Sequence, residues 1–146
     1  MEKNRKELKS FSIVVLVVTA ISLIGIIVNA CVNGIPRITE IYEGMTEDMI
    51  QISSVISFVL TFVIFIPQIY VGVKGIKIAN GAKSGKAHIV WAFILAVLAG
   101  IAAISGIVNI IEAFSTDALL NLVDPAIDLV MFIFYLIYAH QVAREN

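Results

Sequence analysis

Four apolar segments, each about as long as a lipid bilayer is thick, dominate this sequence. They cover about residues 11–32, 50–73, 88–111 and 119–140. A helix rises 1.5 Å per residue, so about 20 apolar residues cross a hydrocarbon core of roughly 30 Å. Because backbone polar groups in lipid must be satisfied within the segment, runs of this length are expected to be helical. The chain is therefore predicted to be all-α, an integral membrane four-helix bundle that forms a single transmembrane domain over residues 1–146.

The composition excludes the main classes of soluble protein. Hydrophobic residues make up 60% of the chain and charged residues 14%, whereas an ordinary soluble domain has about 45–50% and about 25%. The net charge of −1 provides no basic surface for nucleic acid. We expect the lipid bilayer to surround the chain and expect no nucleic-acid partner.

The basic residues predict how the chain is oriented in the membrane. Nine of the ten Lys and Arg residues fall at the two chain ends or in the second connection. The first and third connections are acidic, and their one basic residue is Arg37. Short basic segments stay on the cytoplasmic side of a membrane. Both termini are therefore predicted to be cytoplasmic, in a multi-pass protein of the cell membrane.

Several helix boundaries can be read from local signals. Thr46 is a predicted N-cap, Asn80–Gly81 a predicted helix end, and Pro67 is expected to kink the second helix. Asp124–Pro125 has the pattern of an N-cap followed by Pro at the first helical position. That pattern leaves residues 113–123 as either the outer end of the fourth helix or a separate interfacial helix.

Small and polar residues recur at helical spacing within three of the apolar segments. Helices in lipid associate through close packing of small side chains and through interhelical hydrogen bonds. We expect these stripes to pack the bundle or to join it to other copies, with the third segment as the central packing helix. The stripes are Ala92, Ala96, Ala99, Ala103 and Gly106 in the third segment, Ser54, Ser57, Thr61, Gln68, Gly72 and Gly75 in the second, and Thr19, Ser22, Gly25 and Asn29 in the first.

The first apolar segment allows two interpretations. It is longer than the apolar region of about 7–15 residues found in secretory signals, which favours a retained span. Val28–Cys31 nevertheless resembles a bacterial lipobox, in which the cysteine is lipidated after cleavage, although Asn29 stands where a small residue is usual. Cys31 is the sole cysteine, which excludes an internal disulfide.

A weak internal repeat is also present. Ile27-Val28-Asn29 near the end of the first segment matches Ile107-Val108-Asn109 near the end of the third. The chain could therefore be a duplicated helical hairpin, residues 1–80 and 81–146, or the match could reflect chance and shared topology.

The sharpest candidate site is a set of polar residues in the outer third of the predicted spans. If the fourth helix starts near Leu119, Asp128 lies about 13 Å along it, and an acid within a membrane is a functional hypothesis by default. If the helix starts at Pro125, Asp128 is instead a first-turn acid at the headgroups, which is the simpler interpretation. The candidate ion or ligand site comprises Asp128, Asp124, Asn109, Asn29, Ser54 and Ser57.

Other chemistry has little support in the sequence. The loop Gly81–Lys86 lacks the spacing of a phosphate-binding loop. His88 and His140 are interpreted as polar anchors at the membrane interface, and no catalytic, cofactor or metal site is predicted. Basic residues near a membrane surface attract anionic lipids. The candidates for contact with anionic lipid are Lys74, Lys77, Lys83 and Lys86.

These observations lead to two main functional hypotheses and to a third, a membrane enzyme or redox protein that ligates a haem or metal through His88 and His140. The first is a small non-enzymatic integral membrane protein that acts as an oligomeric or accessory membrane subunit, with further copies of itself or a larger membrane protein as its partner. The alternative is a small cation or proton channel or transporter that uses the outward-facing polar cluster around Asp128.

Overall fold

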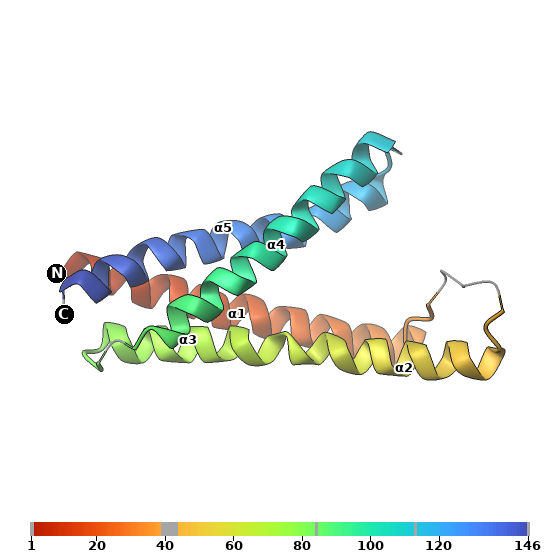
Figure 1. Cartoon of the computed structure of the whole chain (residues 1–146), viewed down its shortest axis with the longest axis horizontal. Helices are drawn as coiled ribbons and strands as arrows, with labels where there is room; N and C mark the ends of the chain where they lie inside the picture. The colour runs from red at the N-terminus through yellow and green to blue at the C-terminus, as the bar shows by residue number, and fades with distance from the viewer. Residues whose placement is uncertain (1, 39–43, 84, 113, 146) are drawn as a thin grey trace. The chain divides into compact units, whose positions relative to one another are not determined.

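The computed structural model describes residues 2–38, 44–83, 85–112 and 114–145, and within these ranges it is helical and contains no strand (Figure 1). The second and third helices follow one another almost without a break, so the chain has four helical segments that are long and apolar enough to cross a membrane. The all-α prediction with four such segments is confirmed. The helices are α1 (Glu2–Asn33), α2 (Glu47–Val63), α3 (Phe65–Ala79), α4 (Ala87–Glu112) and α5 (Thr116–Glu145).

Two predicted helix ends are confirmed in detail. Thr46 has extended backbone angles at the start of α2, and its Oγ1 accepts a hydrogen bond of 3.4 Å from the Met49 N–H. Gly81 follows α3 with a φ of +100°, a conformation that favours glycine. The Ala82 N–H donates to the Lys77 carbonyl at 2.9 Å, and the Gly81 N–H donates to the carbonyl of Ile78 at 2.9 Å. These two bonds form the Schellman ending typical of a glycine at this position.

Near Pro67, where the sequence predicts a kink, the structure shows an interruption of the helix. The helix is interrupted at Ile64, between α2 and α3. Pro67 has no N–H to donate to the Val63 carbonyl, and its ring crowds that carbonyl. Ile64 keeps right-handed helical angles, with φ −68° and ψ −23°, so the interruption breaks the hydrogen-bond ladder while the chain keeps its helical course.

The predicted N-cap at Asp124 is wrong. Helix α5 begins at Thr116, and Pro125 lies inside it. Ser115 provides the cap, because its Oγ accepts a hydrogen bond of 3.1 Å from the Ala118 N–H. A proline inside a helix removes one backbone hydrogen bond, and the helix continues through that loss. Residues 116–123 are thus the first turns of α5, whereas residue 113 lies outside the described residues.

The chain forms two compact units. Unit 1 comprises residues 1–16 and 67–146, which include the first half of α1 together with α3, α4 and α5, whereas unit 2 comprises residues 17–66. In unit 1, α4 packs along α5, and the two ends of the chain lie close together (Figure 1). The Asn4 side-chain amide donates to Glu145 Oε1 at 2.7 Å, which joins the two ends.

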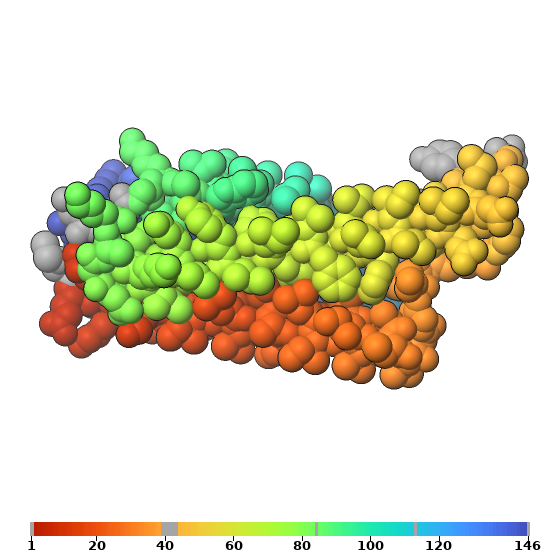
Figure 2. Space-filling model, turned by 90° about the horizontal axis from the view of Figure 1, so that it is seen from below, coloured from red at the N-terminus to blue at the C-terminus, as the bar shows by residue number. Residues whose placement is uncertain are grey.

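Unit 1 contains two close helix contacts. The first half of α1 lies along α3 (Figure 2), where a Cβ on Gly72 would come within 3.1 Å of the backbone oxygen of Ser12. In the second contact, a Cβ on Gly106 of α4 would come within 3.4 Å of the Cα of Leu122 in α5. The predicted stripe of the third segment is therefore a packing seam, with four of its five residues buried and the fifth, Ala99, half-buried. The buried four are Ala92, Ala96, Ala103 and Gly106.

Candidate functional site

The six residues of the predicted ion or ligand site divide evenly between the two units. Asn109, Asp124 and Asp128 belong to unit 1, and the other three belong to unit 2. Each group is therefore described within its own unit, and the joint site of all six stays a prediction. Those of unit 2 are Asn29, Ser54 and Ser57.

The position of Asp128 differs from the simpler interpretation of the sequence. Because α5 starts at Thr116, Asp128 lies about 18 Å along the helix axis from its first residue. It is therefore not a first-turn acid. Asp128 is half-buried, and Asp124 is exposed one turn before it. Residues four apart share a helix face, so the two carboxylates lie on one face of α5.

In unit 2, Ser54 has a structural role. The residue is buried, with 6% of its surface exposed. The hydroxyl donates to the Ile50 carbonyl at 2.8 Å and accepts the Ile38 N–H at 3.0 Å. These bonds tie the connection after α1 to the side of α2, and they leave little hydrogen-bonding capacity for a ligand.

The other two residues of the predicted site in unit 2, Asn29 and Ser57, are exposed. The Asn29 Oδ1 accepts a hydrogen bond of 2.7 Å from the Asn33 side chain, one turn later on α1. Ser57 lies on α2, where its backbone oxygen accepts the Thr61 hydroxyl at 3.0 Å. Both contacts are local to one helix, so these side chains are not organised around a common centre.

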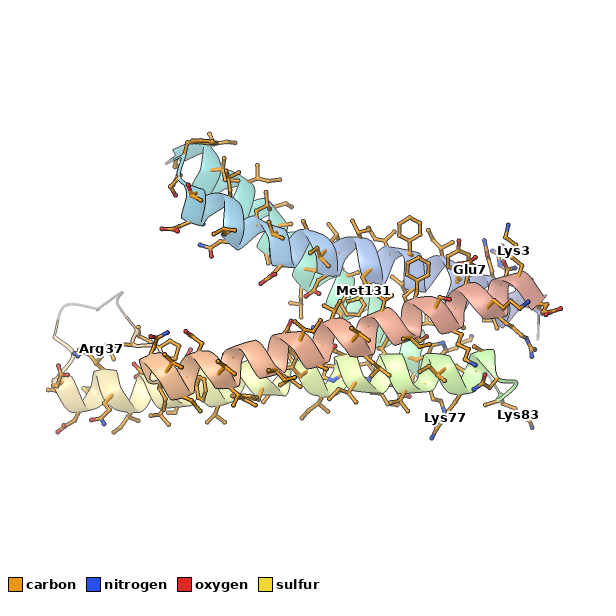
Figure 3. The ribbon with its side chains drawn as sticks, turned by 180° about the vertical axis from the view of Figure 1, so that it is seen from behind. Lys3, Glu7, Arg37, Lys77, Lys83 and Met131 are labelled. Carbon is orange, nitrogen blue, oxygen red and sulfur yellow. The ribbon has the colours of Figure 1, made fainter. Side chains whose placement is uncertain are left out.

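Unit 2 also contains a cleft that the sequence did not predict. Arg37 (labelled in Figure 3) donates from Nη2 to both carboxylate oxygens of Glu47, at 2.6 and 2.7 Å. The pair lines a cleft of about 390 Å³ beside the first turns of α2. The sequence does contain a signal that could have indicated this cleft, because Arg37 is the sole basic residue of an acidic connection. The other lining residues are Ile35, Gln51, Ser54 and Val55.

In unit 1, His88 is fully buried, contrary to its interpretation as an interfacial anchor, whereas His140 is exposed. The His88 ring meets the Tyr135 ring edge-on, with centroids 6.2 Å apart. No hydrogen bond of normal geometry reaches either ring nitrogen from the described residues. The Gly85 main chain and the Lys74 side chain are its polar neighbours.

Tyr135 connects three helices of unit 1. Its hydroxyl donates to the Val71 carbonyl of α3 at 3.1 Å. Gly75, one turn further along α3, leaves the space that the Tyr135 ring occupies, since a Cβ there would lie 2.8 Å from Cε2 of the ring. Together with the His88 contact, this arrangement holds α3, α4 and α5 around one aromatic side chain.

The described residues contain no group of three or more His, Cys, Asp or Glu side chains that could hold a metal ion. No protein-family model, no curated protein and no solved structure matches the chain. The fold alone therefore defines its class, which is an all-α protein with four helices able to cross a membrane.

Proposed function

We propose that this chain is a small non-enzymatic, multi-pass protein of the cell membrane that acts as an oligomeric or accessory membrane subunit. The observation that carries this proposal is the exposure of small residues on unit 2. Gly25, in the middle of a candidate span, has no atom of another helix within 4 Å of the place where its Cβ would lie. Ser57 and Thr61 are likewise exposed on α2.

Such a face is better suited to another helix than to lipid. Acyl chains gain most from covering large apolar side chains, whereas a glycine lets a second helix backbone approach closely. The residues beside Gly25 are bulky and well exposed, with Ile21 at 64% and Ile24 at 61%. A partner helix seated on Gly25 would contact these side chains at its margins.

The mass of the protein after mild-detergent extraction from its native membrane tests this proposal. We expect a species larger than one chain, and we expect Gly25→Leu to reduce it to a monomer by blocking close approach. Ile24→Leu, which keeps a large apolar side chain on the same helix, should leave the mass unchanged. A monomeric wild-type protein that brings no other membrane protein with it would disprove the subunit hypothesis.

The proposed orientation, with both termini cytoplasmic, rests on the distribution of basic residues and has its own test. In a Cys31→Ser background, a cysteine introduced at Gly44 should react with an impermeant maleimide in intact cells. A cysteine introduced at Lys83 should react after the cells are opened. The reverse pattern, or equal labelling of both, would contradict the orientation.

A second function, a cation or proton channel or transporter, is favoured by the depth of Asp128 in α5. A carboxylate in a membrane span is costly unless it has a partner or a function. Asp128→Asn should then abolish cation or proton flux into vesicles, whereas Asp117→Asn, in the first turn of α5, should not. Flux that survives Asp128→Asn would remove this residue from the pathway.

A further inference from the structure

The turn between α3 and α4 concentrates positive charge without nearby acids in the sequence. Lys77, Lys83 and Lys86, which we call the turn lysines, are exposed, whereas Lys74 is half-buried beside His88. The chain contains no Asp or Glu between Asp48 and Glu112. The four lysines predicted to meet lipid are thus of two kinds, three free to reach outward and one packed within unit 1.

The turn lysines differ from Lys6 of α1, which has an acidic partner. Lys6 lies 3.0 Å from Glu2 in an ion pair one turn apart, and Glu7 follows in the next position. None of the turn lysines forms an ion pair with another residue in the described part of the chain. The positive charge of the turn is therefore left for a partner outside the chain to neutralise.

The turn lysines lie in or beside the turn that joins two candidate spans. Lys77 is in the last turn of α3, and its carbonyl accepts the Ala82 N–H in the Schellman ending at Gly81, where the chain leaves the helix. Lys83 follows one residue later, and Lys86 immediately precedes α4. In Figure 3, Lys77 and Lys83 project outward from this end of unit 1. The end of a span is the level at which phospholipid headgroups lie.

We propose that Lys77, Lys83 and Lys86 bind the phosphate groups of anionic phospholipids in the leaflet where α3 ends. A lysine ammonium is a compact, mobile cation that suits a phosphate. Each basic residue near an anionic membrane surface changes lipid affinity by about fivefold. This proposal does not depend on a protein partner, so it stands or falls separately from the subunit hypothesis.

Trp91 provides an intrinsic probe for this site. It is the sole tryptophan of the chain, it is 44% exposed, and it lies in the second turn of α4, close to Lys86. The protein is reconstituted in vesicles of phosphatidylcholine and phosphatidylglycerol, mixed three to one, with bromine on one lipid or the other. Bromine quenches the fluorescence of tryptophan it touches, so the ratio of the two quenching curves gives the relative affinity for the two lipids.

We expect the brominated phosphatidylglycerol to quench wild-type Trp91 several-fold more effectively than its share of the bilayer requires. The combined variant K77Q/K83Q/K86Q should lose this preference, so that the two brominated lipids quench in proportion to their shares of the bilayer. Quenching by brominated phosphatidylcholine alone should remain, which verifies that the variant is folded and inserted.

A matched control removes three exposed cations from the same end of unit 1 but not from the turn, in the variant K3Q/K9Q/R144Q. It should keep the wild-type preference. The proposal would be overturned if the wild type showed no preference for phosphatidylglycerol, or if the turn variant kept that preference unchanged. An equal loss of preference in the control variant would overturn it too, because it would indicate a diffuse surface charge. Binding of a soluble polyanion by the turn lysines without any lipid preference would also overturn it, in favour of an acidic macromolecule.

Discussion

The two halves of α1 belong to different units and differ in their surroundings. In unit 1 the first half buries Leu8, Ser12 and Val15, and Gly72 and Gly75 of α3 both lie close to Ser12. In unit 2 the second half continues a stripe of small residues, but Gly25 has no atom of another helix within 4 Å of its Cβ position, and Asn29 is exposed. A small residue therefore marks a helix contact only where the facing helix offers a surface that fits it.

The fit in unit 1 is steric. The Ser12 hydroxyl donates to the Leu8 carbonyl at 2.6 Å, so its polar group is satisfied within α1 and the helix surface stays narrow. Gly75 then brings the α3 backbone against it. On unit 2 the equivalent narrow surface is present but open, which is why we assign it to a partner.

The largest expected effect is that of Gly75→Ala. A Cβ at this position would lie 2.8 Å from Cε2 of Tyr135 and closer still to Ser12 Oγ, so both helices would have to move. We expect a loss of about 3 kcal/mol in the free energy of unfolding, measured by titration with a denaturing detergent. Gly25→Ala, in the open half of α1, is the control and should change stability by no more than about 1 kcal/mol. Equal losses in the two variants would contradict the comparison.

Ala92→Leu is expected to have the next largest effect. It tests whether the seam of α4 is as tightly packed as the contact of Gly75 in α3. Ala92 is fully buried, and a leucine there would cost about 2 kcal/mol by overpacking. Ala102→Leu, on an exposed position of the same helix, should leave the unfolding curve in place. A seam that accepts the leucine at Ala92 without loss would show that α4 packs loosely.

Tyr135→Phe should have the smallest effect. It removes the hydroxyl that donates to Val71 and keeps the ring that fills the space beside Gly75. Hydrogen bonds between helices in membranes contribute about 0.6 kcal/mol on average, so a loss near that value is expected. Tyr138→Phe is the control, because the ring of Tyr138 stacks at 5.5 Å on Phe11 and that contact needs no hydroxyl. A loss as large as that of Gly75→Ala would show that the hydroxyl, and not the ring packing, holds the contact.

Hydrophobic segment length was enough to predict four helices long enough to cross a membrane, and local signals were enough to predict the cap at Thr46 and the ending at Gly81. The start of α5 was left open between two alternatives, because Asp124–Pro125 is a strong local signal for a helix start. This signal does not start a helix here, because α5 is already capped at Ser115 and continues through Pro125 with the loss of one backbone hydrogen bond.

The candidate site was harder to predict than the fold. His88 was interpreted as an interfacial anchor because it lies at the end of a predicted span, whereas its burial depends on Tyr135, which lies far away in sequence. The packing role of Ser12 was also missed. Its spacing with Leu8, Val15 and Thr19 is that of a packing stripe, but it lies at the start of the apolar segment, where charged residues obscure the pattern.

The interruption at Ile64 has a mechanical consequence. It lies three residues before Pro67, where the chain passes from unit 2 back into unit 1. A missing backbone hydrogen bond makes bending cheaper at that point than elsewhere along a helix. Spans adapt to bilayers of different thickness by tilting or kinking. Bending at this point would leave the glycine contact of α3 with α1, which lies within unit 1, intact.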